Sequence, residues 1–281
     1  MNSENIRSNR KKYIKSALVL LIVIALLLFC SYQNRHLETT YYTYKAEQLG
    51  ADLEGYRIVP ISDLHNVKFG KNNQKLVDRI RECEPDMIVL TGDLVDSNHT
   101  NVDRAVQFVD EIVKICPVYY VTGNHEYWLD TSEYEKLMDG LVSAGVVILD
   151  NQVVEISRGD AKFRLVGLDD KSLADGTLEA LLSDEKELTV VLAHEPQYFA
   201  RYAGTGVDLV LSGHAHGGQF RLPFVGGIVA PDQGFLPEYT AGEYYMNGTE
   251  MIVSRGLGNS VIPVRLFNYP EIVCVELVGM H

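Results

Sequence analysis

The sequence has little cysteine and lacks the motifs of several enzyme classes. Only four of its 281 residues are cysteines, Cys30, Cys83, Cys116 and Cys274, and no two of them form a C-x-x-C pair. This spacing excludes a disulfide framework and a thiolate zinc site, so the cysteines are expected to be small buried residues. The chain also contains no G-x-S-x-G nucleophile elbow, no P-loop and no internal repeat. These absences argue against α/β-hydrolases, P-loop nucleotide-binding proteins and repeat architectures.

Positive charge is scarce outside the N-terminus. Lysine and arginine number 25 against 38 aspartates and glutamates, which gives a formal net charge of −13. Residues 1–32 hold five basic residues against Glu4, so the rest of the chain carries −17. A body this acidic is not expected to bind nucleic-acid backbones in general. At 46% hydrophobic and 22% charged residues, the composition is that of a globular chain with a sizeable core.

One long hydrophobic run stands near the N-terminus. Residues 17–30 are apolar without interruption, and residues 16–32 are predicted to form a transmembrane or signal-anchor helix, because a spanning helix needs ~20 residues with a range of ~17–25. No small-residue cleavage site follows, which favours an uncleaved anchor over a cleaved signal peptide, the open alternative. The preceding basic residues predict a cytoplasmic tail over residues 1–15 and an extracytoplasmic body over residues 33–281. The expected location is therefore the cell membrane, with a single span.

The body alternates between β-rich and helical patterns. Helical spacing covers residues 72–83, 102–115 and 132–144, between β-rich runs at 57–62, 87–91, 118–122 and 146–149. An edge strand is predicted over residues 39–45. The second half is richer in strands, with short helices expected at 177–182 and 196–203 and with loops and hairpins expected over 220–239. This alternation predicts an α/β sheet whose polar loops follow the carboxyl ends of the strands. Further strands are expected at 153–156, 163–167, 188–193, 208–212, 251–254 and 272–277.

Histidines and acidic residues gather in loops that follow predicted strands. Because the strand ends of an open α/β sheet converge at one edge, these loops are expected to pool their side chains. Extended backbone in Asp-x-His and His-x-His would point both side chains the same way. Glycines before the polar residues would permit tight turns and close backbone approach. The five loops carry Asp63-Leu64-His65, Gly92-Asp93, Gly123-Asn124-His125-Glu126, His194 and Gly213-His214-Ala215-His216.

This collection of side chains predicts a site for divalent metal ions. Carboxylate, amide and imidazole ligands without sulfur suit Mn, Fe, Zn or a similar ion rather than Cu(I) or an iron–sulfur cluster. Each motif alone is weak, because a lone Asp-x-His is usually a turn and a lone histidine is usually structural. The evidence for a metal site is that these motifs occur together at five strand ends. Nearby polar residues have simpler interpretations: a turn for Asp169-Asp170, a hydrogen bond to a ligand for Glu126 and an N-G turn for Asn247-Gly248.

The ordered motifs D-x-H, G-D, G-N-H-E, H and G-H-x-H resemble those of the calcineurin-like metallophosphoesterase superfamily. The stretches GHAHGGQ, RLPFVGGIVAP and SRGLGNS are similar to a membrane-tethered bacterial branch of that superfamily, the YkuE/YaeI-like phosphoesterases. The resemblance covers roughly residues 38–277. It implies a four-layer α/β/β/α sandwich in a metallophosphoesterase domain over residues 33–281, preceded by the N-terminal helix.

The resemblance also implies a dinuclear metal site and a hydrolytic reaction. Two divalent ions can bridge a hydroxide that attacks phosphorus in line, so a phosphodiester, pyrophosphate or phosphomonoester would be hydrolysed. Asp93 would bridge the ions. One ion would be held by Asp63, His65 and His216, and the other by Asn124, His194 and His214.

The resemblance assigns the catalytic role to His125, which would face the substrate and neutralise or protonate the leaving oxygen. The alternative for His125 is a residue that only orients its neighbouring ligand. Asn124 and His125 are also expected to bind substrate. Tyr127 and Trp128 could line the mouth of the site, although packing explains both aromatic residues equally well.

The substrate is less closely defined. The membrane anchor and the apolar segment 220–236 favour a lipid-linked or amphiphilic phosphate ester, although this segment could simply cover a sheet edge. UDP-2,3-diacylglucosamine is a candidate that the resemblance implies, while nucleotides, cyclic phosphodiesters and phosphoproteins stay open. Two other functions also stay open: a catalytically weak metal- or phosphate-binding module anchored to the membrane, and a binding protein with structural histidines. Sequence alone leaves the metal, the export route and the oligomeric state undetermined.

Overall fold

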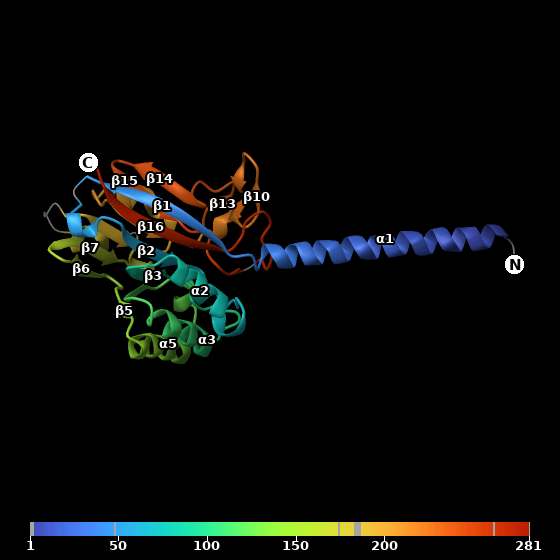
Figure 1. Ribbon diagram of the computed structural model, residues 1–281, viewed down its shortest axis with the longest axis horizontal. Coiled ribbons are helices and arrows are strands. Elements are labelled where there is room, and N and C mark those ends of the chain that lie inside the picture. Colours follow the sequence, from blue (N-terminus) through green and yellow to red (C-terminus); the bar gives the residue numbers. More distant parts are fainter. Residues whose placement is uncertain (1–2, 48, 174, 183–186, 261, 281) are drawn as a thin grey trace.

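Two six-stranded sheets pack face to face at the centre of the molecule (Figure 1). The structure is a computed structural model that describes all residues except 1–2, 48, 174, 183–186, 261 and 281, with the backbone alone for residues 3–10. The first sheet has the order β1 (Glu38–Ala46), β16 (Glu271–Gly279), β2 (Tyr56–Ile61), β3 (Met87–Thr91), β4 (Val118–Val121), β5 (Val147–Ile148). The second has the order β14 (Gly242–Met246), β15 (Thr249–Val253), β9 (Leu209–Ser212), β8 (Thr189–Leu192), β7 (Ala161–Gly167), β6 (Gln152–Arg158).

Helices cover the outer face of each sheet. The core between the sheets contains residues such as Ile58, Val89 and Leu211, which are fully buried. The apolar faces of three helices cover the first sheet, and two shorter helices cover the second. The predicted four-layer α/β/β/α sandwich is thus confirmed. The outer helices are α2 (Gln74–Glu82), α3 (Val102–Ile112) and α5 (Thr131–Ala144) on the first sheet, and α6 (Thr177–Leu181) and α7 (Phe199–Ala203) on the second.

Strand directions determine which end of the body carries the functional loops. β1 begins directly after the N-terminal helix and runs parallel to β16, with Glu38 opposite Glu271. β2 runs antiparallel to β16, with Ile58 opposite Val275, and β3 and β4 are parallel to β2. The carboxyl ends of β2, β3 and β4 therefore point back toward the N-terminal helix. The loops that follow these strands lie at the end of the body from which that helix leaves.

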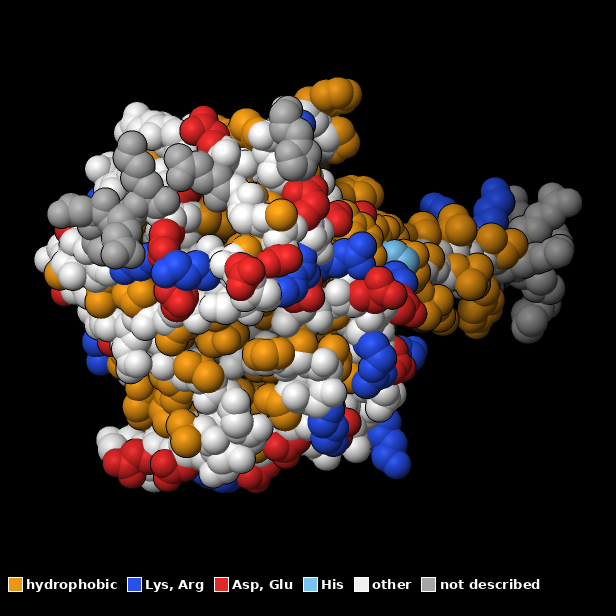
Figure 2. Space-filling model, turned by 60° about the vertical axis from the view of Figure 1, so that its left-hand side comes forward, with side chains coloured by type: hydrophobic (Ala, Val, Ile, Leu, Met, Phe, Trp, Pro, Cys, Tyr) orange, Lys and Arg blue, Asp and Glu red, His pale blue; other side chains and the backbone are white. Residues whose placement is uncertain are grey.

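The N-terminal helix projects from the body as a single rod (Figure 1). This helix, α1 (Ser3–Gln33), contains a 23-residue stretch, Lys11–Gln33, that is long and apolar enough to span a membrane. The predicted anchor over residues 16–32 lies inside it, and the described part of the basic tail continues the same helix. Hydrophobic side chains cover the rod in the space-filling view (Figure 2). Leu18 and Leu28 are examples, at 57% and 67% exposure.

Two small hairpins lie between strands β9 and β14 of the second sheet. They agree with the loops and hairpins predicted over residues 220–239. One hairpin pairs β10 (Arg221–Leu222) with β11 (Gly226–Gly227), and the other pairs β12 (Val229–Ala230) with β13 (Gly234–Phe235). Sequence analysis missed strand β14, which extends the second sheet beside β15. It also missed the one-turn helix α4 (Asn124–Tyr127). Short 3-10 turns occur at η1 (Ala51–Leu53), η2 (Lys71–Asn73), η3 (Asp170–Ser172), η4 (Pro196–Tyr198) and η5 (His216–Gly218).

Candidate metal centre and active site

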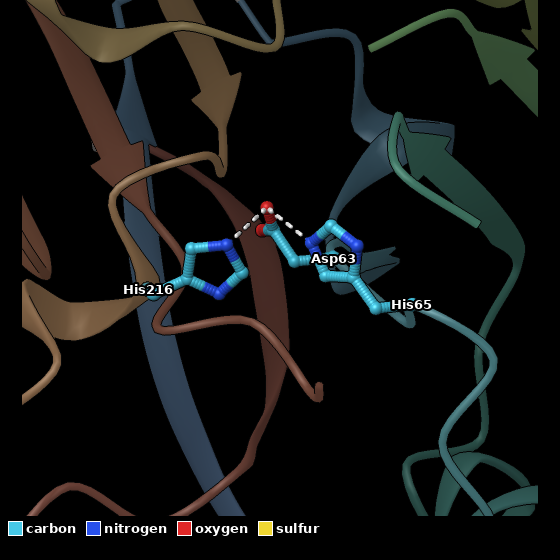
Figure 3. Close-up of side chains that lie close together, drawn as sticks. All are labelled: Asp63, His65 and His216. Atoms are coloured by element: carbon cyan, nitrogen blue, oxygen red, sulfur yellow. Dashed lines mark ion pairs between the residues drawn. The ribbon is translucent and has the colours of Figure 1, made fainter. Parts of the chain in front are cut away.

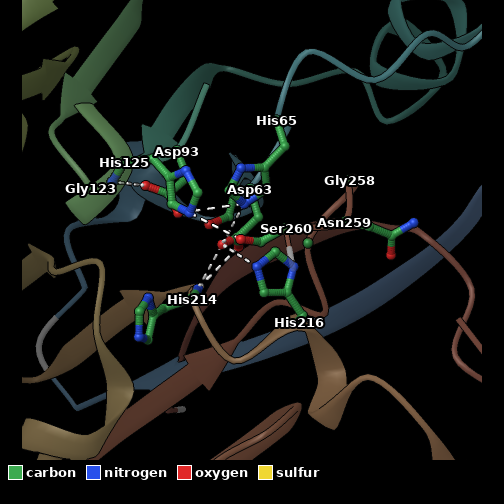
Figure 4. Close-up of polar contacts among 12 residues, drawn as sticks. Asp63, His65, Asp93, Gly123, His125, His214, His216, Gly258, Asn259 and Ser260 are labelled. Carbon is green, nitrogen blue, oxygen red and sulfur yellow. Dashed lines mark hydrogen bonds and ion pairs between the residues drawn. The ribbon is translucent and has the colours of Figure 1, made fainter. Parts of the chain in front are cut away.

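The five loops predicted from the sequence meet at one point between the two sheets (Figure 4). Loops after β2, β3 and β4 come from the first sheet, and loops after β8 and β9 come from the second. The residues that they bring together are almost completely buried, and only Asn124 is partly exposed. The pooling of ligands that the strand-end argument predicts is therefore observed. Two groups of side chains can be distinguished within the cluster.

The first group consists of Asp63, His65 and His216, which point toward one another (Figure 3). Asp63 Oδ1 lies 4.0 Å from His65 Nε2 and 3.7 Å from His216 Nε2. Both ring nitrogens of His65 and the Nδ1 of His216 are buried without a hydrogen-bond partner among the described residues. Burial lowers the pKa of His65 to about 3, so its imidazole is neutral and its lone pair is available. Unpartnered nitrogens facing a carboxylate at these separations fit a bound divalent cation.

The second group consists of Asn124, His194 and His214. The amide oxygen of Asn124 lies 3.1 Å from both His194 Nε2 and His214 Nδ1, and these two nitrogens are 3.2 Å apart. The opposite nitrogen of each ring faces an acceptor: His194 Nδ1 lies 2.7 Å from the carbonyl oxygen of Thr91, and His214 Nε2 lies 2.9 Å from Asp232 Oδ2. Each acceptor can receive a hydrogen bond from a ring N–H, so that in the neutral rings the nitrogens beside Asn124 carry the lone pairs. Burial lowers the pKa of His194, but Asp93 and the other nearby carboxylates together raise it more, so a metal ion that binds there displaces a proton. This arrangement is typical of imidazoles that bind a metal.

Asp93 lies between the two groups. Its Oδ2 is 3.5 Å from His65 Nε2 and 3.3 Å from His194 Nε2, so one carboxylate faces a histidine of each group. Burial alone would raise the pKa of Asp93, but His194 and His65 hold it below the usual range. The other oxygen, Oδ1, accepts a hydrogen bond of 2.9 Å from the backbone N–H of His125. Asp93 therefore remains ionised between the two groups, in contact with a histidine of each.

The backbone of the ligand loops differs from the predicted extended conformation. Asp63, His65, Asp93, His214 and His216 all have left-handed backbone, with φ values between 43° and 63°. Left-handed backbone is costly for residues other than glycine and persists only where the surroundings enforce it. Side-chain alternation along an extended strand is therefore the wrong reason for the convergence of Asp-x-His and His-x-His. The tight left-handed turns bring these side chains together instead.

Glu126 fixes the relative position of two ligand loops. Its Oε2 accepts hydrogen bonds from the backbone N–H groups of Asp93 at 2.9 Å and Gly123 at 2.8 Å, and its Oε1 accepts one from Leu94 at 2.8 Å. Burial raises the pKa of Glu126, while the backbone N–H donors lower it. The net effect, to which the charge of Asp93 also contributes, is a pKa raised to about 8. Both oxygens serve as hydrogen-bond acceptors for these backbone N–H groups. The sequence predicts a hydrogen bond between Glu126 and a ligand histidine. This prediction is wrong, because Glu126 accepts hydrogen bonds from the backbone of the ligand loops instead.

Glycines let the loops approach one another closely. A Cβ atom on Gly213 would lie 1.7 Å from Ser62 Oγ and 2.5 Å from Asp63 Oδ2. A Cβ on Gly123 would lie 2.4 Å from Asp93 Oδ1. No real side chain tolerates such contacts, so the predicted need for glycine before His214 and Asn124 is confirmed.

The imidazole of His125 is oriented by contacts at both ring nitrogens. Nδ1 accepts a hydrogen bond of 3.2 Å from the backbone N–H of Ser97. In the neutral ring the proton is then on Nε2, which lies 3.0 Å from Ser260 Oγ. The ring also stacks in a tilted arrangement with Trp128, at 4.7 Å between centroids, and Trp128 is 63% exposed. His125 is thus held at the edge of the cluster with a donor N–H available.

The predictions that Trp128 and Tyr127 line the mouth of the site have different outcomes. Trp128 lies against His125 at the surface, as expected for a residue at the mouth of the site, whereas the hydroxyl of Tyr127 donates to Asp169 Oδ2 at 2.6 Å. The turn predicted for Asp169-Asp170 is observed, because Asp169 caps η3 by accepting from the N–H of Lys171. Burial raises the pKa of Asp170 to about 7.

Sequence reasoning assigned no role to the segment over residues 255–268, which supports the site from one side. Arg265 is fully buried, and its guanidinium donates to the carbonyl oxygens of Arg255 and Gly258. Asn268 Nδ2 donates to the carbonyl oxygen of His216 at 2.7 Å. The SRGLGNS stretch and the polar Asn268 were the only available signals, because nothing in their spacing indicates contact with distant loops.

A four-layer α/β/β/α sandwich with side-chain groups that could hold metal ions at its strand ends is the architecture of a metallophosphoesterase. The calcineurin-like phosphoesterase family matches residues 56–218, and this chain belongs to that family. The chain is therefore a phosphoesterase by family, and divalent metals are the general cofactor of such enzymes.

Several curated proteins are similar to this chain over most of its length. It is 32% identical over 262 residues to the uncharacterized metallophosphoesterase YkuE of Bacillus subtilis, covering 89% of this chain and 88% of YkuE. It is 32% identical over 228 residues to the phosphodiesterase YaeI of Escherichia coli, covering 79% of this chain and 82% of YaeI. It is also 29% identical over 256 residues to a transmembrane protein with metallophosphoesterase domain of Danio rerio, covering 82% of this chain and 55% of that protein.

Proposed function

We propose that this protein is a membrane-anchored, two-metal phosphohydrolase whose substrate is a lipid-linked or amphiphilic phosphate ester or pyrophosphate. The observation that carries the proposal is the shared carboxylate of Asp93 between two buried ligand groups. In this proposal Asp63, His65 and His216 hold one ion, and Asn124, His194 and His214 hold the other. The ions, which would be Mn, Fe, Zn or similar, would activate a water molecule and polarise the phosphoryl group when bound.

The residues of the chain supply orientation and a hydrogen-bond donor. Thr91 and Asp232 hold the rings of His194 and His214 so that lone pairs face the second ion. His125 carries its proton on Nε2 because Nδ1 accepts from the N–H of Ser97. His125 is therefore set to donate a hydrogen bond from Nε2–H to the leaving oxygen and to stabilise the negative charge that develops there. Asn124, at the exposed side of the second group, would contact the substrate together with His125.

The substrate class is supported by where the site lies. The carboxyl ends of β2–β4 point toward α1, so the metal loops lie at the end of the body from which the anchor leaves. We infer that α1 spans the membrane with the basic tail in the cytoplasm and the body outside. A phosphate carried on a lipid would then reach the site from the membrane surface. UDP-2,3-diacylglucosamine is one candidate of this class.

The reaction can be tested with the full chain in detergent and bis(p-nitrophenyl) phosphate as the substrate. We expect hydrolysis with added Mn²⁺ and none with EDTA. Asp93→Asn should lose metal and rate together, whereas His125→Ala should retain metal and lose rate by about 10²–10⁴-fold. Asp160→Asn, which changes an exposed carboxylate in the same way, is the matched control. Full activity in H125A would contradict the role of His125 at the leaving oxygen, and a metal-loaded wild type without turnover would favour a binding module.

The substrate class needs a separate comparison. Long-chain and short-chain versions of the same phosphodiester should be offered to the full chain in lipid nanodiscs. A preference for the long-chain ester supports a lipid-linked substrate. Equal kcat/KM for both esters would indicate a soluble substrate and would leave the hydrolytic proposal intact.

A further inference from the structure

Exposed hydrophobic side chains are concentrated at one end of the body. Beyond α1, the described residues include twelve large hydrophobic side chains that are exposed, and six of them lie in the two hairpins and the loop beside them. The other six are dispersed over the remaining surface, as is normal for soluble domains. The six clustered side chains, here called the apolar rim, are Leu222, Phe224, Val225, Phe235, Leu236 and Phe267.

The rim places apolar residues where hairpins usually carry polar ones. Phe224 lies in the connection between β10 and β11 at 109% exposure, and Phe235 in β13 is 74% exposed. Phe224, Leu236 and Phe267 have left-handed backbone, with φ values of 67°, 54° and 52°. Turn positions of this kind favour glycine, asparagine or aspartate. Bulky apolar residues at such exposed positions leave a contiguous apolar surface in contact with water, which is unusual for a soluble domain.

The rim contacts the end of the apolar helix α1 through ring packing and through hydrogen bonds. The rings of Phe29 in α1 and Phe267 in the rim are in edge contact, with centroids 6.0 Å apart. The backbone N–H of Phe267 donates to Gln33 Oε1 at 3.1 Å. Next to it, Arg221 of β10 donates its N–H to the carbonyl oxygen of Leu266 at 2.9 Å. The last turn of α1, the 266–267 loop and the first hairpin therefore form one connected unit.

The connection between anchor and body is also short and well bonded. Only residues 34–37 separate α1 from β1. Within them, Asn34 Nδ2 donates to the carbonyl oxygen of Pro263, and Asn34 Oδ1 accepts from the N–H of Arg265, both at 2.8 Å. The hairpin strands β10 and β13 lie at the end of the body from which α1 leaves (Figure 1), and hydrophobic side chains project from the body on that side (Figure 2). A bilayer crossed by α1 would meet the rim at its surface.

We propose that the apolar rim inserts into the lipid bilayer beside α1 and holds the metal site at the level of the lipid headgroups. This inference rests on the proposed membrane anchorage of α1. Lipid is favoured over a protein partner because the rim adjoins the last turn of the spanning helix and extends its apolar surface. The body carries −17, so insertion of apolar side chains, rather than charge attraction, would hold it against a membrane.

Tryptophan fluorescence in brominated lipid tests the proposal. The full chain, reconstituted in nanodiscs, would carry Phe224→Trp or Phe235→Trp, and the wild type, with Trp128 alone, gives the background. The matched control is Tyr245→Trp, because Tyr245 is an aromatic residue at 69% exposure in β14. It lies near Met280 at the far end of the sheets from α1.

We expect bromine on the acyl chains to quench the added emission of F224W and F235W by about half or more, and to leave that of Y245W unchanged. Quenching of either rim variant no greater than that of Y245W overturns the proposal. The measurement needs no turnover, so its failure is distinguishable from failure of the proposed hydrolysis. Protection of α1 from protease in the same sample confirms that the helix is inserted.

Discussion

Replacement of Glu126 by glutamine tests whether one buried carboxylate holds the ligand loops in place. In the wild type, Oε2 accepts from the N–H groups of Asp93 and Gly123, and Oε1 accepts from that of Leu94. Glutamine keeps the shape of the side chain but offers only one acceptor oxygen. The arrangement that loses least keeps the oxygen toward Asp93 and Gly123 and turns the amide NH2 toward the N–H of Leu94. At least one buried donor is then left unsatisfied.

The cost of that change can be worked out from the structure. A buried donor without an acceptor costs about 1–3 kcal/mol, and the amide hydrogens of the new side chain add to it. If the loss falls on global stability, the free energy of unfolding decreases by about this amount. If it falls on the loop that carries Asp93, metal affinity decreases by roughly 5- to 150-fold. Both the free energy of unfolding and the metal affinity should be measured, because the cost of the unsatisfied donor can be divided between them.

Urea denaturation and metal titration are suitable assays for E126Q. The matched control is Glu135→Gln, an exposed residue in α5 that undergoes the same chemical change. We expect E135Q to equal the wild type in both assays. If E126Q also equals the wild type in both, the hydrogen bonds to Glu126 do not position the ligand loops and the reasoning is refuted.

Three further perturbations have defined outcomes. Gly213→Ala would place a methyl group 1.7 Å from Ser62 Oγ, so we expect a loss of about 1–3 kcal/mol in unfolding free energy and a reduced metal content by elemental analysis. Ser260→Ala removes the hydroxyl 3.0 Å from His125 Nε2; kcat should fall roughly fivefold, the equivalent of about 1 kcal/mol, with metal content unchanged. Burial raises the pKa of Glu250 to about 7 in the folded chain, above its unfolded value, so the folded state binds more protons and stability decreases as the pH rises from about 4.5 to 7. Glu250→Gln should abolish that decrease in urea denaturation across this range, and an unchanged pH profile would contradict it.

Local patterns were sufficient to predict the layers of the fold. Strands such as β3 and β8 are continuous apolar runs, and α2 and α3 repeat apolar residues at helical spacing, so each element carries its own signal. The strand-end rule then grouped the ligand loops without any long-range information. β14 escaped notice because it follows a glycine- and proline-rich segment and carries no fully buried residue.

The details of the site were less accessible to sequence reasoning. The left-handed backbone at Asp63 and His214 depends on tertiary contacts, such as the hydrogen bonds from the N–H of His214 to both oxygens of Asp63, between residues 151 positions apart. The contact of Ser260 with His125 joins residues 135 positions apart. No spacing rule relates such pairs. The sequence therefore identified which side chains gather, and the structure was needed to show what orients them.

The pairing of β1 with β16 has a consequence for how the protein is made. β1 is an edge strand whose ladder is formed with β16 alone, and their partners Glu38 and Glu271 are 233 positions apart. During translation β1 emerges long before β16, so β1 stays unpaired until the residues of β16 have been made. An exposed strand edge of this kind is open to wrong pairing while it waits. Termination before residue 271 would deprive β1 of its partner and β2 of one of its two neighbours, so such chains should aggregate rather than form shortened enzymes.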